Sequence, residues 1–385
     1  MSDLENRIKK LEDFNEMLVT VYNLWGMWET PSPPSPTPDP DPTPDPVPVP
    51  PPVDEWEPPF PATFYSGWPD VSWADPAPDR PLKNDGEPFP KRLDDVLVEK
   101  LTFLDRLYRN GSKGDKYENV IFRNCYFNDG LEWRGVADNV LFEDCVFLDN
   151  SISLQGNNRK VRFRNCKILD VHRPDRSSTW PAKGSKIQGI YASEIDGLHI
   201  DECLFDYVGW RGGYDLDRGP GPQPPTMYSH TLYVQRDCLN VGVEDSLFSR
   251  AASTGFQMRS GGLIRNNVIV DCGVGFNCQA GENGLGNQSW VEGNIVAHAA
   301  RKPANGRWIG AQDWSWHLQV DGITALNNVW IDADDPNITN GVTLLGDEGN
   351  RESTVNLKEV LSPANIRQNH ILAMMNARRL VYGNA

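Results

Sequence analysis

Four acidic side chains in the second half of the chain could do hydrolytic chemistry. Asp215 and Asp217 stand two residues apart in the stretch GGYDLDRG, while Glu282 and Asp313 follow in later stretches. Two carboxyl groups hydrolyse a glycosidic bond when they lie about 5 Å or about 6.5–9.5 Å apart, depending on the mechanism. The fold would therefore have to bring a later carboxylate opposite Asp215 and Asp217.

Three basic side chains offer a different chemistry, the removal of a proton beside a sugar carboxylate. His230, Arg259 and His317 occur in the contexts SHTLYVQ, FQMRSGG and WSWHLQV, and such an elimination needs a positioned base. His230, Gln257 and Arg259 begin or end successive expected strands, so stacked strands would bring them onto one face. Polar residues are also ordinary at strand ends, and none of these contexts is a specific catalytic motif, so a structural or ligand-contacting role is favoured. The catalytic candidates are Asp215, Asp217, His230 and Arg259.

Aromatic residues crowd three insertions, at residues 171–186, 206–230 and 300–317, which are also rich in Arg and Asp. Aromatic faces stack on sugar rings, polar side chains satisfy the hydroxyls, and binding residues concentrate on loops held by a rigid scaffold. The same aromatic residues would also suit contacts between subunits, where Trp and Tyr are enriched. The candidate glycan-binding residues are Trp180, Trp210, Arg211, Tyr214, Gln257, Glu282, Trp308, Trp314, Trp316 and His317.

No cofactor and no metal site is predicted. The aspartates of DLDRG lack the D-x-D-x-D-G pattern of a calcium loop, and no Cys/His spacing matches a zinc site. The seven cysteines are odd in number, and most of them recur at one position of a repeat. Buried, unpaired thiols in a protein that assembles in a reducing cytoplasm are therefore expected.

Short repeats are the elements that would position all these side chains. NVIFRNCYF (119–127) returns as NVLFEDCVF (139–147) and KVRFRNCKI (160–168), and six further copies follow, the last at 363–371. In the first copy Val120 and Phe122 alternate as in a strand with one buried face, and the phase shifts after Asn124. Because Asn tolerates left-handed backbone angles, each copy predicts two short strands joined by a tight bend.

A third strand is expected between copies, because stretches such as SISLQG, HTLYVQR and GFQMRSG also alternate. Three strands in each turn of roughly 20–25 residues, stacked turn on turn, are the signature of a parallel β-helix. One interior column of small residues is predicted, formed by Cys125, Cys145, Cys166, Cys203, Ser246, Asn267, Asn294, Asn328 and Asn369.

These repeats resemble the right-handed parallel β-helix proteins of the pectate-lyase-like group, which include polysaccharide lyases and bacteriophage tailspikes. The resemblance covers about residues 115–375. It implies an all-β fold, a right-handed parallel β-helix solenoid. It does not decide the function, since one fold hosts many activities.

The chain before the repeats divides into three expected segments. Residues 1–30 predict an α-helix with heptad spacing, either a coiled coil or an amphipathic helix docked on a partner. Residues 31–54 are a Pro-rich linker, expected to be an extended rod of roughly 70 Å. Residues 55–114 hold an irregular Trp/Pro-rich segment and the cap of the β-helix; strands are slightly favoured over a capping helix at 94–111. The β-helix head is assigned to residues 115–385.

The formal net charge of −16 argues against a nucleic-acid partner. Neither a secretory signal nor an apolar stretch of about 18 residues is visible, so no membrane insertion is expected. We expect a virion spike or fibre protein of a phage or phage-like particle, a homo-oligomer with a trimer favoured. It would attach through its N-terminal helix and bind bacterial cell-surface polysaccharide. The alternatives are a polysaccharide depolymerase (lyase or glycoside hydrolase) and a non-catalytic structural decoration protein.

Overall fold

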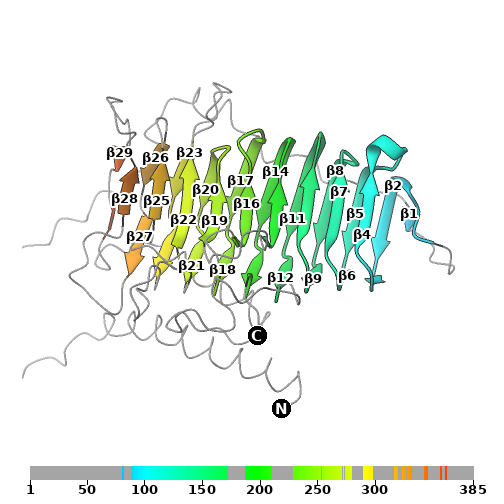
Figure 1. Cartoon of the computed structure of the whole chain (residues 1–385), viewed down its shortest axis with the longest axis horizontal. Helices are drawn as coiled ribbons and strands as arrows, with labels where there is room; N and C mark the ends of the chain where they lie inside the picture. Colours follow the sequence, from blue (N-terminus) through cyan, green and yellow to red (C-terminus); the bar gives the residue numbers. More distant parts are fainter. Residues whose placement is uncertain are drawn as a thin grey trace, which may run out of the picture. The chain divides into compact units, whose positions relative to one another are not determined.

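The computed structural model describes residues 80–81, 88–171, 187–209 and 229–297, apart from 253, 271, 273 and 280–288, together with six later strands between 316 and 361. All of these belong to the compact unit formed by residues 65–385. The described chain is built from strands and one short 3-10 helix, η1 (Gly111–Lys113). Every pair of neighbouring strands is parallel, and the strands form three sheets of eleven, nine and ten strands (Figure 1).

From β2 onward, each sheet takes every third strand of the chain, and β1 pairs with β2 at the edge of one sheet. The eleven-stranded sheet contains β1 (Arg80–Pro81), β2 (Arg92–Glu99), β5 (Lys116–Arg123), β8 (Ala137–Glu143), β11 (Asn158–Arg164), β14 (Ile195–Asp201), β17 (Leu239–Glu244), β20 (Gly262–Arg265), β23 (Ser289–Glu292), β26 (Ile323–Leu326) and β29 (Asn356–Leu357). The ten-stranded sheet contains β3 (Thr102–Phe103), β6 (Tyr126–Phe127), β9 (Val146–Leu148), β12 (Lys167–Leu169), β15 (Leu204–Asp206), β18 (Leu247–Ser249), β21 (Val268–Val270), β24 (Ile295–Ala297), β27 (Asn328–Ile331) and β30 (Val360–Leu361). The nine-stranded sheet contains β4 (Leu107–Asn110), β7 (Leu131–Arg134), β10 (Ile152–Gln155), β13 (Ile190–Ala192), β16 (Leu232–Val234), β19 (Thr254–Met258), β22 (Val274–Gln279), β25 (Trp316–Gln319) and β28 (Val342–Leu345).

A chain that visits three parallel sheets in turn, once per coil, is a parallel β-helix. The predicted all-β fold with three strands per turn is therefore confirmed for the described residues, whereas the hand of the coil stays a prediction. The strands expected at 94–111 are present, since β2, β3 and β4 form the first coil there. The expected N-terminal helix (1–30) and Pro-rich linker (31–54) lie outside the described residues, as does the ninth repeat copy, at 363–371. The strands that pair with β26 and β27 are β29 and β30.

In the described repeat copies the predicted bends occur at the Asn/Asp position, which is Glu202 in the fourth copy and Gly293 in the seventh. Asn124, Asp144 and Asn165 have φ values of 53°, 54° and 50°. Asp245 and Asn266 continue the series at 48° and 54°. These are left-handed backbone angles, which short polar side chains adopt at low cost. The bend turns the chain from the eleven-stranded into the ten-stranded sheet and shifts the buried phase, so that the residue after each bend faces inward.

Stacked rings fill the core of the first coils. Phe122, Phe142 and Phe163 lie in register on β5, β8 and β11, with ring centroids 5.0 and 4.8 Å apart and interplanar angles of 17° and 10°. All three rings are fully buried. Because parallel strands place identical positions of successive coils in contact, repeating one aromatic residue yields a continuous column.

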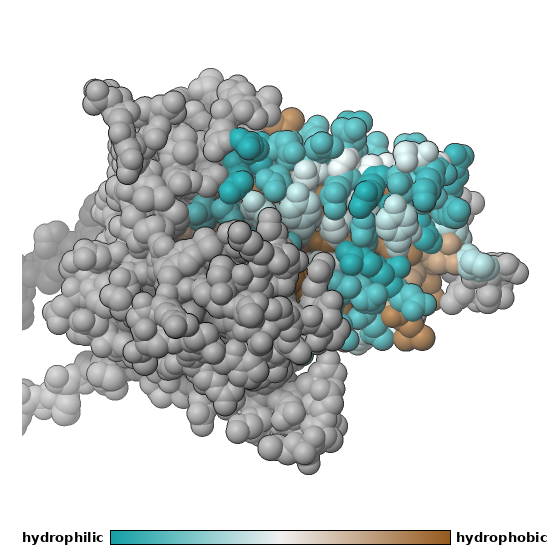
Figure 2. Space-filling model, in the orientation of Figure 1, coloured by the Kyte–Doolittle hydropathy of each residue, from teal (hydrophilic) through white to brown (hydrophobic). Residues whose placement is uncertain are grey.

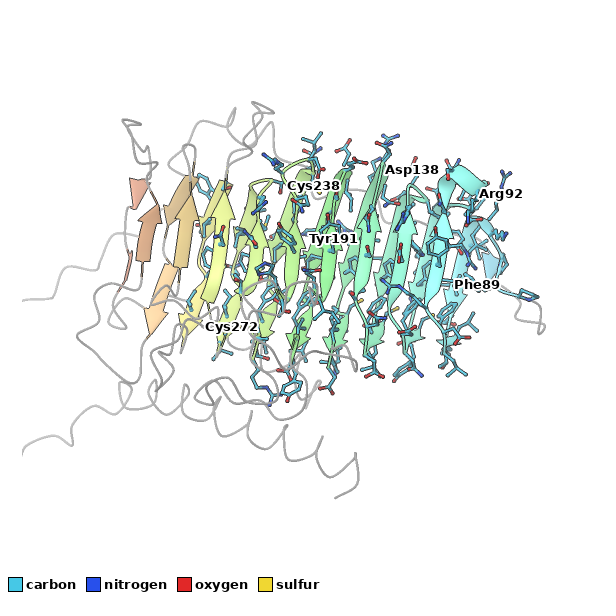
Figure 3. All side chains as sticks on the ribbon, in the orientation of Figure 1. Phe89, Arg92, Asp138, Tyr191, Cys238 and Cys272 are labelled. Carbon is cyan, nitrogen blue, oxygen red and sulfur yellow. The ribbon has the colours of Figure 1, made fainter. Side chains whose placement is uncertain are left out.

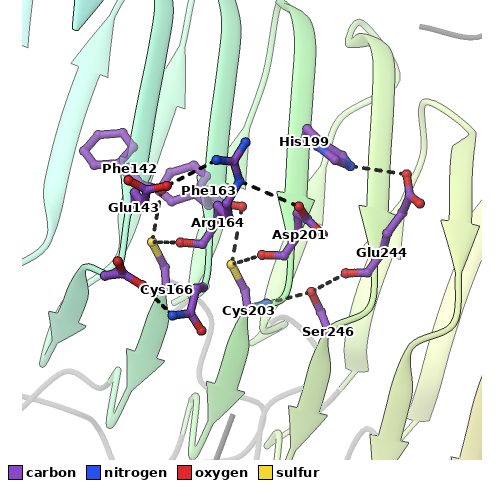
Figure 4. A network of polar contacts seen from close by, with 12 residues as sticks. Phe142, Glu143, Phe163, Arg164, Cys166, His199, Asp201, Cys203, Glu244 and Ser246 are labelled. Carbon is purple, nitrogen blue, oxygen red and sulfur yellow. Dashed lines mark hydrogen bonds and ion pairs between the residues drawn. The ribbon is translucent and has the colours of Figure 1, made fainter. Parts of the chain in front are cut away.

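The interior column of small residues is confirmed from Cys125 to Asn294. The thiols of Cys125, Cys145, Cys166 and Cys203 are free and have no exposed surface. From Ser246 onward side-chain oxygens accept from backbone N–H groups of the preceding coil: Ser246 Oγ accepts from the Cys203 N–H at 3.0 Å (Figure 4), and Asn267 Oδ1 accepts from the Ser246 N–H at 3.1 Å. Of the remaining predicted members, Asn328 begins β27, and Asn369 lies outside the described residues.

The outer face of the described coils is polar in most places, and Figure 2 shows hydrophilic residues over most of it. Hydrophobic residues gather toward the first coils, where Leu104, Tyr108 and Tyr126 are 71%, 40% and 50% exposed. Within the described part of the chain, no helix has the length and apolar character needed to cross a membrane.

Candidate functional site

Most of the predicted site residues lie outside the described residues, and their roles stay predictions. His230, Gln257 and Arg259 are described in full, and Trp316 and His317 by the backbone of β25 alone. The residues outside the described ranges are Trp180, Trp210, Arg211, Tyr214, Asp215, Asp217, Glu282, Trp308, Asp313 and Trp314.

The nine-stranded sheet receives all three long insertions. They belong to the connections from β12 to β13, from β15 to β16 and from β24 to β25. Each of these connections leaves the ten-stranded sheet and enters the nine-stranded sheet. Each insertion is therefore followed directly along the chain by a strand of the nine-stranded sheet. For that reason the starts and the outer face of these strands are the first candidates for a site.

One row of side chains runs across the outer face of this sheet. In β13 and β16 the last residues, Ala192 and Val234, are fully buried in the core. Strand alternation then places the residues before them on the outside, where both are partly exposed. The row, which we call the outer row, consists of Tyr108, Glu132, Ser153, Tyr191, Tyr233, Gln257 and Asn277.

Tyr191 and Tyr233 are neighbours in the outer row, and their ring centroids are 5.8 Å apart. Tyr191 is labelled in Figure 3, midway along the described coils. A second outward position lies two residues farther along each strand. From there Gln235 Nε2 donates to the Tyr191 hydroxyl at 3.3 Å, and the guanidinium carbon of Arg259 lies 5.6 Å from the centre of the Tyr233 ring.

His230 completes this cluster from the start of β16, with its ring 5.0 Å from that of Tyr233. The neighbours of Tyr233 are thus His230, which precedes it on the same coil, and Gln257 and Arg259 on the next coil. His230, Gln257 and Arg259 therefore lie around one tyrosine ring, and the roles expected for them stay predictions. We call these five residues, with Tyr191 included, the tyrosine cluster: Tyr191, His230, Tyr233, Gln257 and Arg259.

Charge and burial in the tyrosine cluster do not suit a general base. His230 is only 7% exposed, and burial, reinforced by the positive charge of Arg259, lowers the pKa of its imidazole to about 3. A base with so low a pKa is neutral but weak at neutral pH, where an efficient catalytic base has a pKa near the working pH. Burial also raises the pKa of Tyr233. The cluster therefore presents neutral hydrogen-bonding groups and one cation.

The two tyrosines were not found from the sequence. The signal was present in the stretches IYA (190–192) and LYV (232–234), where Tyr lies between two apolar residues that face the core. Only the register between coils shows that the two rings are neighbours. In the backbone register of β25, His317 pairs with Asn277 and Trp316 pairs with Phe276. Their expected role in glycan binding stays a prediction.

A second polar feature, the charge ladder, follows the ends of the strands of the eleven-stranded sheet. Opposite charges are paired along most of it: Glu143 Oε2 accepts from Arg123 at 2.7 Å, and Glu143 Oε1 from Arg164 at 3.2 Å. The charge ladder consists of Glu99, Arg123, Glu143, Arg164, Asp201, Glu244, Arg265 and Glu292.

The charge ladder places two acidic residues next to each other at one point, where Asp201 pairs with Glu244, and His199 lies beside this pair (Figure 4). His199 Nε2 is 3.3 Å from Glu244 Oε1, and Arg265 bonds the other oxygen. Burial alone would raise the pKa of Glu244, but these two partners lower it. Gly242 makes room for the imidazole, since a Cβ there would lie 2.8 Å from His199 Cδ2. Because Glu244 is 4% exposed and engaged on both oxygens, the arrangement is structural.

Asp245 lies at the bend directly after Glu244, and the neighbouring carboxylates make ionisation of its own carboxyl less favourable. Burial, together with the charges of Glu244 and Asp201, raises the pKa of Asp245 to about 6. Nowhere in the described coils do three His, Cys, Asp or Glu side chains converge as a metal site requires.

Comparisons with known proteins give a weak likeness, and it comes from solved structures. No family model and no curated protein sequence matches the chain. Among solved structures, the chain is similar to the crystal structure of the Dettilon tailspike protein, with 12% sequence identity and a TM-score of 0.26. The match covers 64% of this chain and 57% of that one, so it spans less than two thirds of the solved structure. The parallel β-helix itself is established by the strand register described above.

Proposed function

We propose that this protein is a virion spike or fibre protein of a phage or phage-like particle, and that its β-helix head binds bacterial cell-surface polysaccharide on the tyrosine cluster. The observation that carries the proposal is the pair of tyrosine rings on the outer face, Tyr191 and Tyr233, flanked by amide and guanidinium groups. Partly exposed rings at this spacing offer the apolar C–H faces of successive sugars a platform. Gln257 and the tyrosine hydroxyls satisfy sugar hydroxyls.

The rigidity of the scaffold supports this use of the face. The tyrosine rings stand on strands that are bonded to neighbours on both sides, so little conformational entropy is lost when a ligand binds. A long polymer can also lie along the direction in which coils stack, where every coil repeats a similar surface.

The N-terminal part of the sequence suggests how the head is presented. Residues 1–30, with their heptads, would form the oligomer, a trimer by preference, and attach it to the particle; the Pro-rich residues 31–54 would hold the head away from it. Deletion of residues 1–30 is expected to leave a folded head that no longer joins particles. Normal incorporation of the truncated chain would contradict the anchoring role.

The experiment that tests the function uses the purified full-length chain and a panel of capsular and exopolysaccharides. Retention on each glycan and release of products, as new reducing ends or unsaturated-uronate absorbance, are measured in parallel. Retention without product is the expected result. Retention with product would instead establish the depolymerase, with Asp215 and Asp217 as the first residues to replace. Absence of both signals would favour a structural decoration protein.

A further inference from the structure

Arg259 is a cation that has no countercharge among the described residues. Several other arginines pair with carboxylates: Arg123 and Arg164 with Glu143, Arg265 with Glu244, and the buried Arg250 with Asp206. Arg259 forms no ion pair in the described structure, and its Nε is buried without a hydrogen bond. The chain carries 53 Asp and Glu against 37 Lys and Arg, so acidic side chains are not scarce.

The groups around Arg259 leave its charge in place. It lies over the Tyr233 ring, a contact that orients the guanidinium but does not neutralise it. His230 is buried beside the same ring, and its Nδ1 also makes no hydrogen bond. The outward side chains of β13, β16 and β19 near it are Tyr191, Tyr233 and Gln257, none of which is acidic.

An unpaired cation and an unbonded imidazole nitrogen beside an aromatic platform fit one class of ligand. A guanidinium recognises carboxylate and phosphate groups through two parallel hydrogen bonds, and such charge-assisted bonds are about twice as strong as neutral ones. A neutral imidazole has one donor and one acceptor, which suits a sugar hydroxyl. An anionic group on a sugar stacked against Tyr233 would supply the missing countercharge to the guanidinium of Arg259.

We propose that Arg259 binds the acidic group of a sugar, a carboxylate or a phosphate, whose ring stacks on Tyr233 next to His230. The inference rests on the proposed function and narrows it: the polysaccharide is an acidic one, and each site holds one anionic group because the tyrosine cluster contains one cation.

The anion site can be tested on the intact protein without knowing the polysaccharide. The ¹⁵N–¹H signal of the Arg259 Nε–H, assigned with Arg259→Lys, is followed while sodium glucuronate, glucose 6-phosphate or glucose is added up to on the order of 100 mM. Glucuronate or glucose 6-phosphate should move the signal along a saturating curve, and the stronger of the two identifies the acidic group. Glucose should leave it nearly unchanged. An equal response to glucose, or no response to either anion, would overturn the inference.

Arg134 provides a matched control for the polymer. It occupies the same outward column as Arg259, four coils earlier, but is paired with Glu132 at 2.7 Å. Arg259→Gln should weaken retention of an acidic polysaccharide by about 10- to 100-fold, and Arg134→Gln should leave it unchanged. Circular dichroism shows whether each variant is folded.

Native polysaccharides and their carboxyl-reduced or dephosphorylated forms separate the two claims. Retention of native forms alone supports both the acidic ligand and the receptor role. Equal retention of both forms leaves the proposed function intact and overturns the inference. Retention of neither form, with a saturating shift of the Arg259 signal, supports the anion site and contradicts the receptor role.

Discussion

Arg259 has the same position relative to Tyr233 as Gln235 has relative to Tyr191, one coil earlier. In each case a polar side chain from the second outward position reaches diagonally back to the tyrosine of the preceding coil, Gln235 to a hydroxyl and Arg259 over a ring face. The same contact geometry thus occurs on two successive coils, with the neutral Gln235 on the first and the cationic Arg259 on the second. The presence of Arg259 beside a tyrosine ring distinguishes the tyrosine cluster from the rest of the outer row.

The imidazole of His230 should not titrate in the physiological range. Its pKa is lowered from 6.5 to about 3, first by burial and then by Arg259, so the unfolded chain takes up a proton before the folded chain does. The stability that His230 contributes is therefore present above about pH 6.5 and is lost as the pH falls toward 3. The ring ¹H–¹³C signals of His230 should keep their neutral positions from pH 8 to pH 5. A midpoint near 6.5 would contradict the burial of this side chain and reopen its candidacy as a base.

Asp245→Asn should stabilise the protein at neutral pH. The pKa of this carboxyl is raised from 3.8 to about 6, so the folded state disfavours the ionised form and binds a proton more readily than the unfolded state. The destabilisation grows as the pH rises from 4 through 6. The gain should be about 1–2 kcal/mol at pH 7.5, allowing for solvent screening, and should vanish near pH 4.

Asn suits the backbone at this position, since Asn124, Asn165 and Asn266 occupy the same bend with similar φ values. The measurement is the melting temperature of wild type and Asp245→Asn at pH 4 and pH 7.5. A difference that does not depend on pH would show that the carboxyl is not strained by its acidic neighbours.

Asn267→Ala should be among the costly substitutions in the interior column. Asn267 Oδ1 accepts from the Ser246 backbone N–H at 3.1 Å, and its Nδ2 donates to the Val243 carbonyl at 2.9 Å. Alanine leaves both backbone groups buried without these partners, which costs about 2–4 kcal/mol. Asn267→Ser is the control, because Ser246 already makes the equivalent hydrogen bond to the Cys203 N–H. Equal loss of unfolding free energy for Ala and Ser in urea titrations would argue against hydrogen bonding as the cause.

The strands, their bends and the interior column could be predicted because each depends on local patterns. Alternation identifies a strand, Asn and Asp identify a left-handed bend, and Cys125 or Asn267 identifies a small inward position after it. The repeat pattern is less informative near the end of the chain. The ninth copy is expected at 363–371, but β29 and β30 lie at 356–361, and residues 356–361 do not show the pattern of the earlier copies.

The tyrosine cluster and the charge ladder could not be predicted in the same way. Tyr191 and Tyr233 are 42 positions apart, with an insertion between them, and only inter-strand register makes their rings neighbours. Glu143, Arg164 and Asp201 each look like an ordinary polar residue at a strand end, and their pairing emerges when coils stack. Which of these residues become neighbours depends on how the coils stack, and this cannot be read from the sequence of any single repeat.

Tyr233→Ala tests most directly the claim that polysaccharide binds on the outer face of the nine-stranded sheet. Tyr108 is the matched control, since it lies in the same outer row on the first coil and is 40% exposed. For a polysaccharide that the wild-type chain retains, loss of the stacked ring should weaken affinity by about 10-fold, whereas Tyr108→Ala should retain wild-type affinity. If Tyr233→Ala and Tyr191→Ala both bind like wild type while folded, the tyrosine cluster is not the binding site.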